Sequence, residues 1–145
     1  MPKQIVILGG GFAGLWAALA AARKLDECHA EGDVEITLVD RTTYHNIRVR
    51  NYEADLSDVC IPLQDVLSPV GVRFIHGEAS DIDAVERKVS VQTRDGLAVI
   101  KYDRLVLALG SELVRPPPPR PDRATRRRWY RVPPMFPRRC RLTGP

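Results

Sequence analysis

The first forty residues alternate between apolar and polar stretches in a way that predicts a strand, a helix and a second strand. Ile5–Leu8 is apolar and mostly β-branched, which is typical of a central strand covered on both faces. Phe12–Leu25 is rich in alanine and predicts a helix. The helical residues expected to face the sheet are Leu15, Trp16, Leu19 and Ala22. Val34–Val39 predicts the second strand.

The middle of the chain is less regular. Arg41–Asp58 is polar and predicts a loop with at most a helical turn. Pro62–Leu67 predicts a short helix, because proline suits the first turn of a helix and the following Ser-Pro pair would end it. Gly71–His76 predicts a third strand, which we expect Gly77 to close.

From Ala79 onward, apolar and polar residues alternate with a period of two residues, as in β-strands. The three segments that show this period are Ala79–Ala84, Lys88–Thr93 and Ala98–Tyr102. Asp95-Gly96, between the last two, predicts a hairpin turn. Arg104–Leu109 is again largely apolar and predicts a return to the parallel sheet. The predicted fold class is therefore α/β, a Rossmann-like parallel sheet with an inserted three-stranded antiparallel meander.

The turn between the first strand and the helix carries a G-x-G-x-x-G spacing. In such a motif Gly9 allows the tight turn, Gly11 lets a pyrophosphate approach the backbone, and Gly14 lets the helix pack closely on the strand. The free N–H groups and the positive dipole end of the helix would face the phosphates. The candidate phosphate-binding residues are Gly9, Gly11, Phe12, Ala13 and Gly14.

Asp40 ends the second strand and completes the pattern of a dinucleotide-binding βαβ unit, where its carboxylate would accept hydrogen bonds from ribose hydroxyls. Two alternatives are a signal peptide and a short membrane span, since Lys3 precedes a long apolar stretch. Three consecutive glycines interrupt that stretch, and neither alternative gives the spacing to Asp40 a role. We therefore prefer the nucleotide-binding interpretation.

Charge and proline content divide the 145 residues into two parts. Residues 1–114 carry a net charge of −5, whereas residues 115–145 carry +9 and nine of the 12 prolines. The chain is long enough for one domain with a real core. We therefore predict a nucleotide-binding domain over residues 1–114 and an Arg/Pro-rich tail over residues 115–145.

Three interpretations of the tail remain open. Its arginines, with Trp129 and Tyr130 among them, could bind nucleic acid or an acidic membrane surface. Its prolines could form an extended ligand for a protein partner. We favour the third, a disordered product of translation in a wrong reading frame, because the sequence becomes arginine- and proline-dominated and lysine-free.

Three segments carry a family resemblance: GGGFAGLWAAL, LVDRTTYHN and YDRLVLALGS. With the meander between them, the chain resembles the N-terminal FAD-binding part of the type II NADH dehydrogenases, within the FAD-dependent pyridine nucleotide-disulfide oxidoreductases. The resemblance covers residues 3–118. Family members continue into a second glycine motif for NAD(P)H, so we expect a truncated chain with an incomplete FAD domain.

The resemblance implies further roles at individual positions. Arg41 would lie near the adenine, and Ala79 would contact it through its backbone. Ala108 and Gly110 would form a second signature near the phosphates; the residue between them, Leu109, stands where the family commonly has threonine. Tyr44 and His45 match an aromatic-His pair whose neighbourhood could approach the flavin. For those two, packing and function are equally good interpretations.

The implied cofactor is FAD, with NAD(P)H as co-substrate and hydride transfer from NAD(P)H to the flavin. Three isolated cysteines with no C-x-x-C pair argue against a disulfide reductase. Within the family this favours a quinone or similar electron acceptor. The expected location is the cytoplasm or the inner face of the membrane. No metal site and no catalytic residue are predicted. Truncation would impair or abolish activity, so the chain's status as an enzyme stays open. The alternative is a non-catalytic nucleotide-binding module whose basic tail binds a partner.

Overall fold

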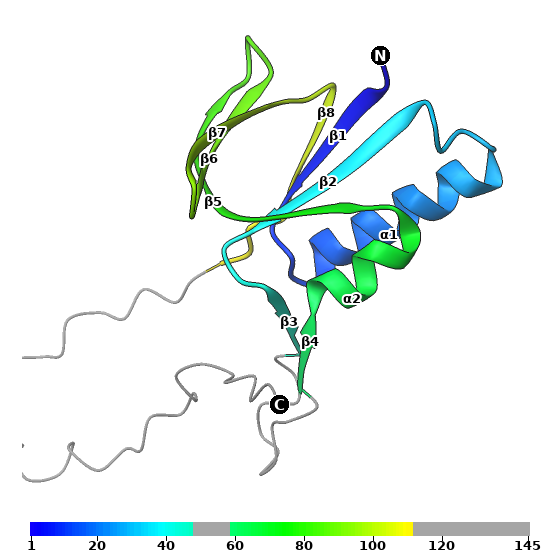
Figure 1. The fold of residues 1–145 in the computed structure, drawn as a ribbon, viewed down its shortest axis with the longest axis horizontal. Helices are drawn as coiled ribbons and strands as arrows, with labels where there is room; N and C mark the ends of the chain where they lie inside the picture. Colours follow the sequence, from blue (N-terminus) through cyan, green and yellow to red (C-terminus); the bar gives the residue numbers. More distant parts are fainter. Residues whose placement is uncertain (48–58, 112–145) are drawn as a thin grey trace, which may run out of the picture.

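The computed structural model describes residues 1–47 and 59–111, so the expectations for residues 48–58 and for the tail lie outside it. Its centre is a six-stranded sheet in the order β7-β6-β5-β2-β1-β8 (Figure 1). The main strands are β1 (Lys3–Leu8), β2 (Val34–Asp40), β5 (Arg73–Asp83), β6 (Lys88–Thr93), β7 (Gly96–Lys101) and β8 (Arg104–Leu107). The helices are α1 (Phe12–Glu27), α2 (Leu63–Leu67) and the 3-10 helix η3 (Ser68–Val70). The strands β5, β2, β1 and β8 are parallel, while β6 and β7 add antiparallel pairs, which confirms the predicted α/β class.

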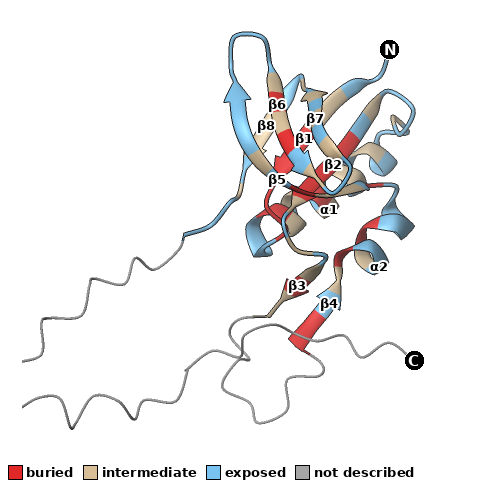
Figure 2. Cartoon of the chain, turned by 60° about the vertical axis from the view of Figure 1, so that its left-hand side comes forward, coloured by how far each residue is buried: buried red, intermediate tan, exposed pale blue. Residues whose placement is uncertain are grey.

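The two faces of the parallel sheet are covered by different elements. Ile7 points to a cluster that includes Ala18 of α1 and Leu63 of α2. Val6 and its neighbours on the other face contact residues of the meander in a second cluster: Val6, Leu8, Val39, Val89 and Val91. Figure 1 shows the helices on one side of β1 and β2 and the meander arching over the other, and Figure 2 shows the buried residues concentrated between them. Because both faces of the central strand β1 are covered, its residues Ile5–Leu8 are all apolar.

The prediction that Trp16 faces the sheet is wrong, because its side chain is 68% exposed. The buried residues of α1 are Gly14 and Ala18, and Ala21 and Leu25 continue the same face. At 100° per residue, Trp16 lies about 200° around the helix from Gly14 and so points away from the sheet. The fully buried positions are small, which lets the helix approach the sheet closely, while Leu15 and Leu25 pack against the same cluster partly buried.

The predicted third strand and the first strand of the meander are one continuous strand, β5. Gly77 does not end it; a Cβ there would lie 2.6 Å from Val91 Cγ1 and 2.8 Å from the Gln92 carbonyl oxygen. The missing side chain therefore lets β5 bend against β6. A bulge between Ala79 and Asp81 increases the local twist. The sheet can thus curl from its parallel part into the antiparallel cover without breaking the strand.

The hairpin between β6 and β7 is confirmed, with one shift in its turn. Thr93 pairs with Gly96, so Arg94 and Asp95 are the central residues, and Gly96 begins β7 at φ +122°. After β7 the chain returns to the parallel sheet as predicted, with Ile5–Leu8 paired to Arg104–Leu107. β8 ends two residues before the predicted Leu109.

The predicted loop Arg41–Asp58 contains a short strand, β3 (Tyr44–Asn46), and another, β4 (Cys60–Pro62), follows it, so the helix predicted to begin at Pro62 begins at Leu63. The two strands pair in antiparallel fashion, with His45 opposite Ile61. They form a ribbon separate from the main sheet (Figure 2). The apolar stretch that follows Lys3 is divided between β1 and α1. No helix in the described part of the chain is long and apolar enough to cross a membrane.

Candidate dinucleotide-binding site

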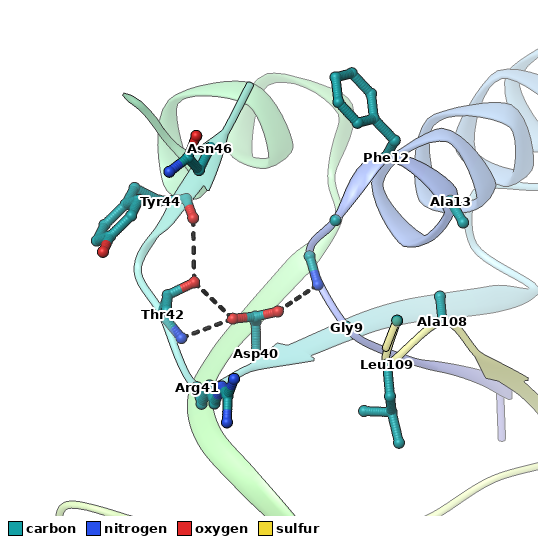
Figure 3. Close-up of a pocket in the computed structure, with 13 residues that line it drawn as sticks. Gly9, Phe12, Ala13, Asp40, Arg41, Thr42, Tyr44, Asn46, Ala108 and Leu109 are labelled. Atoms are coloured by element: carbon teal, nitrogen blue, oxygen red, sulfur yellow. Dashed lines mark hydrogen bonds between the residues drawn. The ribbon is translucent and has the colours of Figure 1, made fainter. Parts of the chain in front are cut away.

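The loop between β1 and α1 lies at the carboxyl end of the parallel strands and can be built only with glycine at its first position. Gly9 has φ +106°, and its N–H donates a 2.8 Å hydrogen bond to the Val39 carbonyl. A Cβ on Gly9 would lie 2.2 Å from the Ala108 carbonyl oxygen. Gly9 therefore lies where β1, β2 and the segment after β8 contact one another. Figure 3 shows Ala108 of that segment near Gly9.

Gly14 is needed for close packing within the protein, whereas Gly11 leaves space open for a ligand. A Cβ on Gly14 would lie 1.8 Å from the Gly9 carbonyl oxygen, so the residue is required for the close approach of α1 to the loop. A Cβ on Gly11 would meet no protein atom within 4 Å. The space above Gly11 is thus open, as a site for a phosphate needs it to be.

The amino end of α1 provides hydrogen-bond donors. Gly11 is the N-cap residue, no side chain caps the helix, and its first turn contains no acidic residue. The Leu15 N–H bonds the Gly11 carbonyl at 2.9 Å, which leaves the N–H groups of the first turn for another acceptor. With the positive end of the helix dipole, these donors fit an anionic pyrophosphate.

Asp40 lies beside this loop at the end of β2. One of its carboxylate oxygens, Oδ2, accepts a hydrogen bond from the Gly10 N–H. The other, Oδ1, accepts from the Thr42 N–H at 2.6 Å and lies 2.7 Å from the Thr42 hydroxyl (Figure 3). A carboxylate has about four lone-pair positions, so these three contacts leave capacity for a ligand hydroxyl.

His45 contacts the same loop from the β3–β4 ribbon. Its side chain is buried, and Nδ1 lies 2.9 Å from the Gly10 carbonyl oxygen. Its ring meets Phe12 edge to face, with the ring centroids 4.6 Å apart. A Cβ on Gly10, the middle glycine of the run, would approach the Leu63 side chain at Cδ1 to 2.7 Å, so this residue is also closely packed.

A cavity of about 430 Å³ opens above the loop. It brings together most of the predicted site residues: Gly9, Gly11, Phe12, Ala13, Asp40, Arg41, Ala108 and Gly110. Gly14 does not line the cavity, since it lies buried at the base of α1. The lining residues come from three separate parts of the chain, the loop before α1, the segment after β2 and the segment after β8.

Ala79, like Gly14, is a predicted site residue outside the cavity lining. It belongs to β5, pairs with Val91 and packs against the cluster beneath the meander. β2 ends at Asp40, which pairs with His76, so it provides no strand partner to Ala79 on that edge of β5. The backbone contact between Ala79 and adenine stays a prediction.

Four lining residues lie outside the predicted set: Gly10, Thr42, Asn46 and Leu109. Tyr44, for which packing and function are equally good interpretations, also lines the cavity, whereas its neighbour His45 does not. Gly10 was visible as the middle of the glycine run, and Thr42 follows the acidic residue by two positions. Nothing in the sequence marked Asn46. Its Oδ1 is buried and has no hydrogen-bond partner among the described residues. The described ranges also contain no cluster of His, Cys, Asp and Glu suited to a metal.

The geometry defines a dinucleotide-binding α/β unit, and comparison with known proteins identifies its family. The model for pyridine nucleotide-disulphide oxidoreductases matches residues 3–128, and the chain belongs to this family. Members of the family are flavoproteins that use NAD(P)H. The match extends past residue 114, the boundary predicted for the domain, which stays a prediction.

Individual relatives match the same region. An NADH dehydrogenase-like protein of Mycobacterium tuberculosis is 53% identical over 114 residues, 78% of this chain and 28% of that protein. A type II NADH:quinone oxidoreductase of Staphylococcus aureus is 33% identical over 113 residues, 74% of this chain and 26% of that protein. The structure of sulfide:quinone oxidoreductase from Aquifex aeolicus matches with a TM-score of 0.64 and 29% identity, over 77% of this chain and 25% of that one. The chain spans about a quarter of the length of these relatives.

Proposed function

We propose that residues 1–114 bind FAD through its ADP half, as the nucleotide-binding part of an NAD(P)H:acceptor oxidoreductase. The observation that carries the proposal is the uncapped end of α1 facing open space above Gly11, with a carboxylate at the end of β2. Membership in a flavoprotein family selects FAD among dinucleotides.

Each group has a separate part in holding the cofactor. The N–H groups of Gly11, Phe12 and Ala13 would donate to the pyrophosphate. Asp40 would accept a hydrogen bond from a ribose hydroxyl, and Arg41 would lie along the adenosine half. Ala108 and Gly110 would contribute the segment after β8 to the lining, with Ala108 close to Gly14 at the start of α1. When bound, the flavin supplies the ability to accept hydride from NAD(P)H; the residues of the site bind and orient it.

The acceptor and the location are proposed from the relatives. The names of two of them specify quinone as a substrate, and we extend this to the protein to which this sequence belongs. Such an enzyme would work in the cytoplasm or at the inner face of the membrane. The 145 residues contain a single G-x-G-x-x-G motif, so we expect one dinucleotide to bind and NADH oxidation by this polypeptide alone to be weak or absent.

Gly11→Ala tests the proposal without disturbing the fold, because a Cβ there meets no protein atom and the φ of −71° suits any residue. The methyl group would occupy the space proposed for the phosphate. We expect FAD and ADP affinity, measured by calorimetry, to fall about tenfold or more, on the scale of one lost charge-assisted hydrogen bond.

The matched control is Gly32→Ala, in the turn before β2, where a Cβ also meets no atom within 4 Å. It should leave both affinities unchanged. Wild-type protein that binds neither FAD nor ADP would refute the proposal, as would Gly11→Ala protein that binds both with wild-type affinity.

A further inference from the structure

We infer that His45 is a positioning residue, which orients the backbone of the phosphate-binding loop through the Gly10 carbonyl. The inference deepens the proposed function and rests on it, because it concerns how the loop recognises a pyrophosphate. His45 lies on the middle position of β3, is 5% exposed and does not line the cavity, so it would act on the ligand only through the loop.

The contact with Gly10 assigns a role to one ring nitrogen of His45. A carbonyl oxygen only accepts, so Nδ1, 2.9 Å away, is the donor of this hydrogen bond. The ring also packs against Phe12 in a T-shaped pair, at an interplanar angle of 88°. His45 therefore acts as a buried donor directed at one carbonyl of the loop.

Holding that carbonyl also orients the next N–H group. In a trans peptide the C=O and N–H bonds point in opposite directions, and no cis peptide occurs in the described ranges. Because the Gly10 carbonyl points to His45, the Gly11 N–H in the same peptide plane points the other way. Gly11 lines the cavity, so this plane sets the direction of one of the proposed phosphate donors.

The preceding peptide plane is held from the other side. The Gly10 N–H belongs to it and donates to the Asp40 carboxylate. Two side chains, Asp40 and His45, thus fix two consecutive peptide planes at a residue whose backbone would otherwise be the most flexible of any type. An ordered loop loses less conformational entropy when a ligand binds, so affinity should depend on both contacts.

The experiment compares three substitutions at His45. Asn places an amide nitrogen near the position of Nδ1, Gln places it farther along the side chain, and Leu removes the donor. We expect His45→Leu and His45→Gln to bind ADP and FAD about tenfold more weakly, as measured by calorimetry. The loss should be the same for both ligands, and it corresponds to one lost buried hydrogen bond. His45→Asn should bind both within about threefold of wild type.

Adenosine, measured by NMR titration, separates positioning from general damage. It lacks the pyrophosphate, so its affinity should be the same in all three variants and in wild type. The His45→Asn and His45→Gln pair keeps the test decisive if His45→Leu does not fold.

Wild-type affinity for ADP in His45→Gln would overturn the inference, as would an equal loss for adenosine and ADP. A folded His45→Asn variant that binds as weakly as His45→Gln would also overturn it. Wild-type protein that binds neither ADP nor FAD would instead refute the proposed function itself.

Discussion

The cavity has two walls that are built on different principles. The wall toward α1 consists largely of backbone, and a side chain on Gly9, or on the adjacent buried Gly14, would overlap a neighbouring main chain. The wall toward β3 consists of side chains, among them Thr42, Tyr44 and Asn46 (Figure 3). The first wall requires residues without a side chain at its close contacts, and the second is held by the hydrogen bonds between Thr42 and Asp40.

This difference determines how each wall should respond to substitution. An atom added at Gly9 or Gly14 meets the main chain of another segment, whereas one added at Gly11 meets open space. A lost hydroxyl or amide in the side-chain wall removes a contact of moderate energy. We therefore expect large losses of stability on one side of the cavity and small changes, of either sign, on the other.

Gly14→Ala should have the largest effect. A Cβ would lie 1.8 Å from the Gly9 carbonyl oxygen. Alanine gains about 1 kcal/mol of helix propensity over glycine. The overlap should outweigh that gain and lower the free energy of unfolding by about 4 kcal/mol or more, in the range of severe core defects.

Urea denaturation followed by circular dichroism measures this change. Gly11→Ala is the control, since it adds the same methyl group three residues away in open space. Equal stability of the Gly14→Ala and Gly11→Ala proteins would remove the distinction between required and permissive glycines.

Thr42→Val should have an intermediate effect. The hydroxyl lies 2.7 Å from Asp40 Oδ1 and 3.1 Å from the Tyr44 carbonyl oxygen. Its loss leaves the Thr42 N–H on the carboxylate, so we expect a destabilisation of about 1 kcal/mol. Thr43→Val, at the exposed neighbouring position, is the matched control and should be close to neutral in the same denaturation experiment. A larger loss from Thr43→Val would show that the side-chain wall is not held by Asp40.

Asn46→Leu should have the smallest effect, and of opposite sign. Its Oδ1 is buried without a partner among the described residues, and burial of an unpaired acceptor is unfavourable. Leucine has a similar volume and no polar atom, so the free energy of unfolding should rise by roughly 0.5 kcal/mol. A rise in melting temperature without ligand checks this, with Gln92→Leu at an exposed position of β6 as the comparison. A fall specific to Asn46→Leu would mean that the amide stabilises the ribbon.

The backbone wall could be predicted because its constraints are local. Gly9, Gly11 and Gly14 lie within six residues, and a strand and an alanine-rich helix flank them in sequence. Asp40 follows at the end of the next apolar run. A close approach of main chains restricts the residue to glycine, so the requirement is written directly in the sequence.

The side-chain wall could not be predicted because its constraints are distant. β3 has three residues, and its partner β4 begins at Cys60, beyond an irregular polar stretch. The same limit applies to β5, where Gly77 resembles a strand end until Val91 and Gln92 are placed beside it. Trp16 differs from its predicted position for another reason: the face of α1 that packs on the sheet is centred on Gly14 and Ala18, so side-chain size does not predict burial there.

The contact between Gly9 and Ala108 also sets the order of events during synthesis. β8 pairs with β1, and the Ala108 N–H donates to the Leu8 carbonyl at 2.8 Å, so the last described strand completes a site begun by the first. On the ribosome, the glycine loop emerges about a hundred residues before the segment that supports it. The proposed nucleotide could therefore be held only after that segment has left the ribosome.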